Sequence, residues 1–293
     1  TAHVDHANVL YEVPQKETGL PMVFLHGYGQ SRTGWMATPD GKPGWADFFL
    51  RHGHSVYLID EPRRGEAGAT GKAGTMTTTP SDQTWYTQFR IGTYKNGAFT
   101  YNKDSKFPKG EAALNQFFRQ MTPDTGMDNA AGEQAIDTDV VAKAVAAAID
   151  EIYDRTGKKS ILVTHSQGGG PGWETVRYTP HVAAIVAIEP GGAAAPGSAA
   201  YKAMAEQKIP VTFYYGDYIG NDLPDIPAAA MWQRMAETAD TFTAAYEKEG
   251  LTSTVVHLPK LGIKGNSHFM FEEANRDEIA ELLEKWLQTY AAK

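Results

Sequence analysis

The chain has 293 residues, of which 42% are hydrophobic and 21% charged, and its formal net charge is −8. This composition is typical of a folded globular protein, and the length suits one large α/β domain or two small ones. The negative charge and the lack of a basic cluster argue against a nucleic-acid partner, and the lack of an apolar run of about 18 residues argues against a transmembrane helix. A chain without cysteine forms no disulfide, no thiolate zinc site and no cysteine nucleophile, while its compartment, cytoplasmic, periplasmic or secreted, stays open.

The first 65 residues predict a parallel β-sheet. Residues 7–14 suit an edge strand, and the apolar segments 21–25 and 55–60 suit buried strands. An amphipathic pattern at 45–50 predicts a short helix between the two buried strands. A strand, a helix and a strand within about 40 residues indicate a parallel-sheet unit.

Residues 66–136 lack this regularity. They are rich in glycine, threonine, proline and asparagine, with many scattered aromatic residues. A structureless loop of this length is improbable in a compact domain, and the segment is too aromatic for a linker. We therefore expect a single domain over residues 1–293 with a lid-like insertion at about 66–136. Two interpretations of the insertion have equal weight: it walls the pocket at the strand ends, or it forms a satellite subdomain away from the site.

Regular patterns return at Asp137, after which apolar residues recur in steps of three and four. Asp137 or Thr138 suits the start of this helix, and Gly157 suits its end. Further strands are expected at 160–165, 182–188, 209–215 and 253–258, with helices at about 228–249 and 271–290. We find no internal repeat, no phosphate-binding loop and no metal-ligand spacing. The sequence therefore predicts no cofactor and no metal.

The segment Thr164-His165-Ser166-Gln167-Gly168 follows one of these strands and precedes a glycine-rich stretch. It is similar to the G-x-S-x-G nucleophile elbow of the α/β-hydrolase fold, with threonine in place of the first glycine. The elbow interpretation makes Ser166 the nucleophile and the backbone N–H of Gln167 an oxyanion donor. The His26-Gly27 pair closing an early strand places the second donor at the N–H of Tyr28. The alternative is an ordinary glycine-rich turn with a bystander serine.

A serine nucleophile needs a general base and a carboxylate that orients the base. In this fold the order along the chain is serine, acid, histidine, which leaves His257 and His268 as candidates. His257 lies inside a predicted strand, whereas His268 follows a glycine-containing loop and is favoured. Glu189, at the end of an apolar strand, is the first choice for the acid, and Asp217 is the second.

A carboxylate at the end of a buried strand needs a partner, because burying it unpaired is costly. Glu189 therefore has a second interpretation as half of a structural salt bridge. Arg177 and Lys202 are the candidate cations for that pair.

The chain resembles a small branch of bacterial α/β-hydrolase esterases whose triad acid is a glutamate at the end of the sixth strand. The resemblance covers most of residues 22–290 and is weakest in the insertion. It rests on Phe24-Leu25-His26-Gly27, Thr38-Pro39-Asp40-Gly41, Tyr57-Leu58-Ile59-Asp60, His165-Ser166-Gln167, Ile188-Glu189-Pro190-Gly191 and Gly265-Asn266-Ser267-His268.

By this resemblance Ser166 is the nucleophile, His268 the base and Glu189 the acid, with oxyanion N–H groups from Tyr28 and Gln167. The chain departs from the branch after His26-Gly27, where it has Tyr28-Gly29 in place of adjacent cysteines. The implied fold is a mostly parallel sheet flanked by helices.

The implied activity is hydrolysis of a small or medium carboxylic ester through an acyl-enzyme. The same residues suit a lactonase, an amidase or an acyltransferase, and a binding protein of this fold without turnover is the alternative from another class. The expected partner is a small-molecule ester, and the oligomeric state is left open, a homodimer included.

Overall fold

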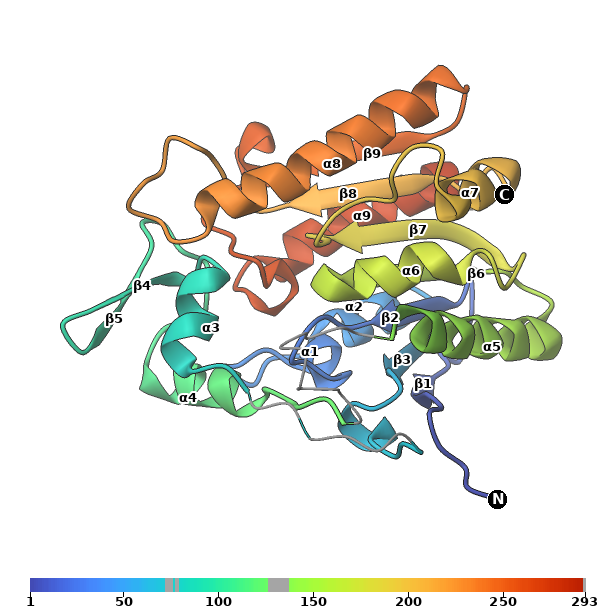
Figure 1. The fold of residues 1–293 in the computed structure, drawn as a ribbon, viewed down its shortest axis with the longest axis horizontal. Coiled ribbons are helices and arrows are strands. Elements are labelled where there is room, and N and C mark those ends of the chain that lie inside the picture. Colours follow the sequence, from blue (N-terminus) through green and yellow to red (C-terminus); the bar gives the residue numbers. More distant parts are fainter. Residues whose placement is uncertain (72–75, 77–78, 126–136, 292–293) are drawn as a thin grey trace.

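The computed structural model describes residues 1–71, 76, 79–125 and 137–291. Within them, a seven-stranded sheet in the order β1-β3-β2-β6-β7-β8-β9 forms the centre of the molecule (Figure 1). Its strands pair in parallel, except that β1 runs antiparallel to β3 at one edge. The strands are β1 (Asn8–Glu12), β2 (Met22–Leu25), β3 (Val56–Asp60), β6 (Ser160–His165), β7 (Val182–Ile188), β8 (Val211–Tyr215) and β9 (Ser253–His257).

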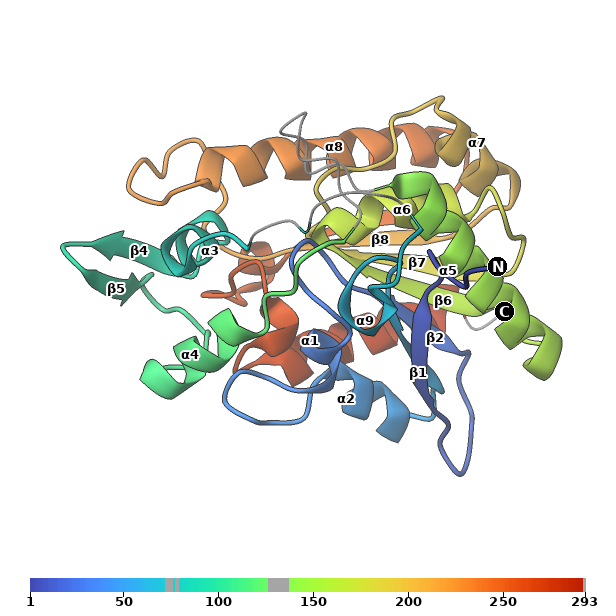
Figure 2. The same cartoon turned by 60° about the horizontal axis from the view of Figure 1, so that its bottom comes forward.

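Helices cover both faces of the sheet, because alternate strand residues point to opposite sides. Phe24 packs in one hydrophobic cluster with Trp45, while its neighbour Val23 packs in the other with Ile149. Figure 2 shows the two helical layers with the sheet between them. One layer contains α1 (Thr33–Met36), α2 (Trp45–Arg51) and α9 (Arg276–Tyr290), and the other α5 (Thr138–Thr156), α6 (Gly169–Thr175), α7 (Ala199–Glu206) and α8 (Ala229–Lys248).

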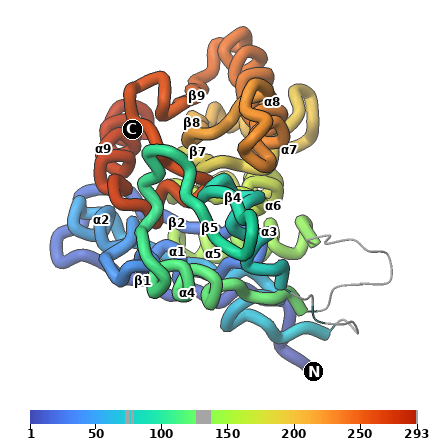
Figure 3. Tube along the Cα trace, turned by 90° about the vertical axis from the view of Figure 1, so that its left-hand side faces the viewer, coloured from blue at the N-terminus to red at the C-terminus, as the bar shows by residue number. Residues whose placement is uncertain are grey.

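The predicted insertion has secondary structure of its own, which lies beyond the carboxyl ends of the sheet strands (Figure 1) and in front of them in the end-on view of Figure 3. Its buried aromatic residues Trp85 and Phe117 belong to the same cluster as Phe24, so they pack onto the main core. Of the range predicted for the insertion, 72–75, 77–78 and 126–136 lie outside the described residues. The insertion contains α3 (Asp82–Gln88), β4 (Gly92–Lys95), β5 (Ala98–Tyr101) and α4 (Glu111–Arg119).

The ends of two helices test the sequence patterns. Of the two candidates for the start of α5, the structure selects Asp137, whose side chain accepts a hydrogen bond from the Val140 N–H. The predicted end is confirmed, with Gly157 at φ 70°. Helix α9 begins at Arg276 rather than at the predicted residue 271. Glu273, just before it, turns inward and accepts the Ser267 N–H at 2.9 Å, so this segment braces a loop instead of extending the helix.

The turn from β6 into α6 leaves no room for extra side-chain atoms. A Cβ at Gly168 would lie 2.4 Å from the His26 carbonyl oxygen. A Cβ at Gly172 would lie 2.6 Å from Cγ2 of Thr164, the residue that replaces the usual first glycine of the elbow. The methyl group of Thr164 is therefore accommodated because α6 presents a glycine opposite to it.

This complementarity predicts a non-additive pair of substitutions. Helix propensity favours alanine over glycine by about 1 kcal/mol, but overpacking typically costs about 1–3 kcal/mol. We expect Gly172→Ala to lower the free energy of unfolding, and Thr164→Ser alone to lower it by about 1 kcal/mol through loss of a buried methyl group. In urea unfolding, the double variant should recover most of the Gly172→Ala loss. Purely additive losses would contradict the proposed contact.

Candidate active site

Ser166 lies at the sharp turn between β6 and α6, as the sequence pattern predicted. Its φ of 54° is in the left-handed region that non-glycine residues rarely adopt. The Gly191 N–H donates to the Ser166 carbonyl at 3.1 Å, which ties the turn to the segment after β7. On the other side, a Cβ at Gly27 would lie 2.7 Å from the Ser166 Cβ. The turn is thus held in a strained conformation by the loops after two neighbouring strands.

His268 is fully buried between aromatic rings. Its imidazole stacks on Phe89 of the insertion, with ring centroids 4.8 Å apart, and contacts the tilted ring of Trp232 of α8 at 4.1 Å. Its Nδ1 lies 2.8 Å from Oε2 of Glu189. Nε2, on the opposite edge of the ring, has no hydrogen-bond partner within the described part of the chain, and no hydrogen bond joins it to Ser166 Oγ. The ring is therefore oriented through one nitrogen while the other is unpartnered.

Glu189 follows β7, the fifth strand that the chain contributes to the described sheet, and it has a strained φ of 42°. Its carboxylate is fully buried. Arg90 Nη2 donates to Oε1 at 2.6 Å and to Oε2 at 2.7 Å, and the Gly216 N–H donates to Oε1 at 2.7 Å. With the His268 contact, both oxygens of the carboxylate are engaged.

The electrostatics of this pair follow from burial and from Arg90. Burial disfavours the imidazolium and lowers the pKa of His268 to about 4, although the contact with Glu189 acts in the opposite direction. Burial alone would raise the pKa of Glu189, but Arg90 and His268 outweigh it and hold that pKa below its ordinary value. At neutral pH the site therefore contains a neutral imidazole beside an ionised carboxylate.

The remaining acid and base candidates are engaged elsewhere. Asp217, the second choice for the acid, accepts hydrogen bonds from the backbone N–H groups of Tyr218 and Gly265 and makes none with His268. His257 stacks on Tyr215 and lies 3.8 Å from Asp240.

The expected cations for Glu189 were wrong. Arg177 pairs with Glu174 on the surface, and Lys202 is exposed. The actual partner is Arg90, which the insertion supplies from 99 positions away in the sequence. The cost of burying a carboxylate predicted that a cation exists, but no periodic pattern marked this one.

Tyr28 and Gln167, the expected oxyanion donors, both line a pocket of about 520 Å³ that Ser166 also lines. The insertion contributes to this pocket through Gln88 and Phe89. The pocket is otherwise mainly apolar, with glycines, indole rings and two methionines one turn apart on α8: Gly170, Trp173, Gly191, Gly192, Ala193, Met231, Trp232 and Met235. An apolar group bound next to Ser166 would contact mainly aromatic and thioether side chains.

Two structural features bear on partners. Within the described residues, no group of three or more acidic or histidine side chains is arranged to hold a metal ion. Among the same residues, no helix combines the length and the hydropathy needed to cross a lipid bilayer.

Comparison with known proteins identifies the family. No protein-family model matches the chain. A probable secreted lipase, phiG, of Fungal sp. (strain ATCC 74256) is 30% identical over 340 aligned positions, covering 94% of this chain and 84% of the lipase. A solved bacterial esterase superposes with a TM-score of 0.82 at 26% identity, covering 99% of this chain and 87% of its own.

Similarity in fold extends further than similarity in sequence. Dienelactone hydrolase from Anabaena variabilis ATCC 29413 shares 18% identity at a TM-score of 0.51, covering 97% of this chain and 92% of its own. The conclusion rests on the fold and on the relatives. The mostly parallel sheet is flanked by helices on both faces and carries a strained serine turn at its strand ends, and the relatives include a probable secreted lipase and a bacterial esterase. The chain belongs to the α/β-hydrolase superfamily and is one of its carboxylic-ester hydrolases.

Proposed function

We propose that this chain hydrolyses carboxylic esters by two-step acyl transfer, with Ser166 as nucleophile, His268 as general base and Glu189 as the acid that orients His268. The observation that carries the assignment is the 2.8 Å contact between His268 Nδ1 and Glu189 Oε2. A carboxylate at Nδ1 fixes the proton there and leaves the lone pair on Nε2, the nitrogen that takes the serine proton in a triad.

In the first step Ser166 Oγ attacks the ester carbonyl carbon while its proton moves to Nε2 of His268. Glu189 stabilises the imidazolium that forms. Collapse of the tetrahedral intermediate breaks the bond to the alkoxy group, which takes the proton from Nε2 and leaves as the alcohol. Water then attacks the acyl-enzyme with His268 again acting as base, which releases the carboxylic acid and regenerates Ser166.

We assign the stabilisation of the negative charge that forms on the carbonyl oxygen to the backbone N–H groups of Tyr28 and Gln167. Each such donor is worth roughly 3 kcal/mol of the activation barrier, or about a hundredfold in rate. Since the donors are main-chain groups, Gln167→Ala should reduce the rate far less than Ser166→Ala.

The proposal requires Ser166 Oγ to come within hydrogen-bond reach of His268 Nε2. Such hydrogen bonds are often long before substrate binds and shorten in the complex. The buried and unpartnered Nε2 supports this role, because leaving a buried polar atom unpaired costs about 1–3 kcal/mol and is most readily explained at a site of function.

The pocket supports an ester with an apolar acyl or alcohol group. Trp173, Met231, Trp232 and Met235 offer a mainly apolar surface, and the pocket volume of about 520 Å³ exceeds what an acetyl group would fill. That the relatives include a probable secreted lipase and an esterase agrees with this substrate class.

The triad assignment is tested by comparing variants of the two candidate acids. We expect Ser166→Ala to remove activity on chromogenic esters by several orders of magnitude and to abolish labelling by a fluorophosphonate probe. Glu189→Gln should reduce kcat by about 10⁴-fold through loss of the correct imidazole orientation. Asp217→Asn is the matched control, and its kcat should fall by less than about tenfold. Strong loss in Asp217→Asn with Glu189→Gln unaffected would overturn the acid assignment, and a wild-type protein that neither turns over esters nor reacts with the probe would overturn the function.

The pH dependence of kcat/KM tests the electrostatics of His268. The neutral imidazole accepts the proton, so activity is lost as the pH falls through its pKa of about 4. We expect a plateau from neutral pH down to about pH 5 and a decline below it. Arg90→Met should move this decline to higher pH, because Arg90 lowers the pKa of both His268 and Glu189.

Two controls accompany that measurement. Arg90→Lys keeps the positive charge and should leave the acid limb nearly in place, and Arg177→Met removes an exposed arginine and should not move it. An acid limb that is the same in Arg90→Met and in the wild type would contradict the role given to Arg90.

Pocket size predicts a chain-length effect. Met235→Trp adds volume to the wall of the pocket, so we expect kcat/KM for octanoyl and longer esters to fall by about tenfold or more. One methylene in an apolar pocket is worth about 1–3 kcal/mol, and an acetyl ester should be hydrolysed almost as before. Equal losses on short and long esters would show that this wall does not contact the acyl chain.

A further inference from the structure

We propose that Arg64 is a positioning residue that fixes the direction of the oxyanion-binding N–H of Tyr28. The inference rests on the proposed function, since it assigns a role at the same site. Arg64 lies in the loop after β3 and is almost completely buried. Sequence reasoning did not single it out.

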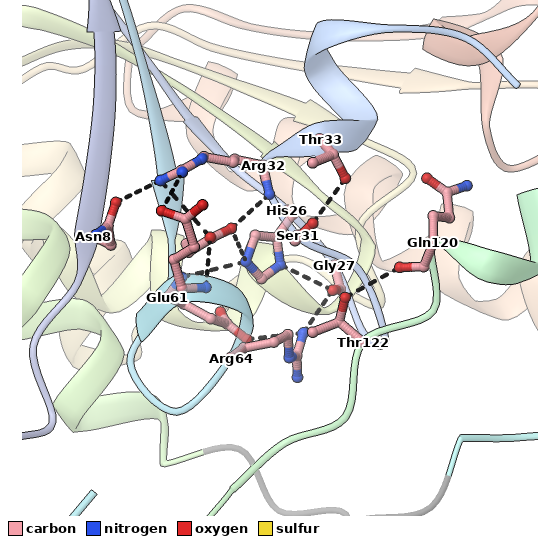
Figure 4. Close-up of polar contacts among 12 residues, drawn as sticks. Asn8, His26, Gly27, Ser31, Arg32, Thr33, Glu61, Arg64, Gln120 and Thr122 are labelled. Carbon is pink, nitrogen blue, oxygen red and sulfur yellow. Dashed lines mark hydrogen bonds and ion pairs between the residues drawn. The ribbon is translucent and has the colours of Figure 1, made fainter. Parts of the chain in front are cut away.

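The guanidinium of Arg64 contacts both segments that carry the proposed oxyanion donors. Nη1 donates to the Gly27 carbonyl at 2.6 Å, as Figure 4 shows. Nη2 donates to the side-chain oxygen of Gln167 at 3.1 Å. One rigid, planar cation therefore bridges the loop after β2 and the residue after Ser166.

The hydrogen bond from Arg64 to the Gly27 carbonyl determines the direction of the Tyr28 N–H. In a planar trans peptide the carbonyl of Gly27 and the N–H of Tyr28 point in opposite directions. A glycine tolerates many backbone conformations, so this peptide would be free to rotate unless its carbonyl were held. The Gly27 carbonyl is held toward the buried Arg64, so the Tyr28 N–H points in the opposite direction. Tyr28 lines the pocket next to Ser166.

Two neutral groups also contact the Gly27 carbonyl. The Gln30 N–H donates at 3.2 Å, and Nδ1 of His26 lies at 3.1 Å. Burial lowers the pKa of His26 to about 3, so this ring is neutral and Arg64 is the charged donor among the three. A charge-assisted bond is stronger than a neutral one, and it also polarises the peptide so that the Tyr28 N–H becomes a better donor.

Two carboxylates hold Arg64 itself. Asp124 of the insertion accepts from Nε at 2.5 Å and from Nη2 at 2.7 Å, and Glu61 lies 2.9 Å from Nη1. The backbone directs the side chain inward: Arg63 and Gly65 have φ of 72° and 56°, while Arg64 between them is extended. Arg63 consequently binds elsewhere, to Asp5 and Asp137.

This arrangement supplies a matched pair of variants, Arg64→Lys and Arg63→Lys. Both keep the charge at a buried, ion-paired arginine, but only Arg64 contacts Gly27 and Gln167. A lysine ammonium cannot reach the Gly27 carbonyl, Gln167 and both carboxylates together. For Arg64→Lys we expect kcat on a chromogenic ester to fall about tenfold or more, with KM changed less than about threefold, since the affected interaction forms in the transition state. Arg63→Lys should leave both values near those of the wild type.

A second readout separates positioning from general destabilisation. A trifluoromethyl ketone that forms a tetrahedral oxyanion on the serine should bind Arg64→Lys more weakly by the same factor as the loss in kcat. If Arg64→Lys does not fold, Asp124→Asn serves in its place, because it loosens the guanidinium while keeping the shape of its partner, and it should show a smaller fall in kcat with KM retained. If the wild type is active and Arg64→Lys has the same kcat as Arg63→Lys, the inference is overturned. A change in Arg64→Lys that is confined to KM would overturn it as well. A wild-type protein inactive on esters would instead overturn the proposed function.

Discussion

A single buried carboxylate, that of Glu189, organises the charged groups of this site. Removing an ionised carboxylate from water costs several kcal/mol unless charged and hydrogen-bonding partners replace the solvent. Arg90, His268 and the Gly216 N–H are those replacements, and together they engage both oxygens. Burial, and to a smaller extent the charge of Arg90, lowers the pKa of His268, so the imidazole is neutral and ready to accept a proton. The same ion pair thus holds the pKa of Glu189 below its ordinary value and keeps an ionised carboxylate beside the proposed base.

Three of the strained backbone positions lie at the same groups. Ser166, Glu189 and Arg90 all have positive φ, at 54°, 42° and 60°. Such conformations cost of order 1–3 kcal/mol each for residues with a side chain, and they persist where surrounding contacts over-determine them. Here the surrounding contacts are the Gly27 loop packed against the serine turn and the hydrogen bonds to the Glu189 carboxylate. The strain directs three polar side chains from three separate segments to one edge of the sheet.

Local patterns predicted the parts of this protein that depend on local physics. Apolar runs identified the sheet strands. Chain order left two candidate bases, and the glycine-containing loop before His268 favoured it over His257, which lies inside a strand. The rule that a buried carboxylate needs a partner indicated a cation for Glu189 but selected the wrong residues. Arg90 and Arg64 escaped prediction because the groups that they contact at the site are distant in the sequence. The loops that carry these two arginines have neither periodicity nor a motif. The catalytic roles of Ser166, His268 and Glu189 stay predictions, while the structure shows how their environments are built.

Two buried ion pairs join the insertion to the residues around the site. Arg90 binds the Glu189 carboxylate, and Asp124 binds Arg64 beneath the Gly27 loop. Separating a buried ion pair costs about 3–5 kcal/mol, because it leaves an uncompensated charge. Swinging the whole insertion away would break both pairs and would also displace Phe89 from the His268 ring. A large displacement of the insertion is therefore costly, because Arg90 and Phe89 both contact the Glu189–His268 pair.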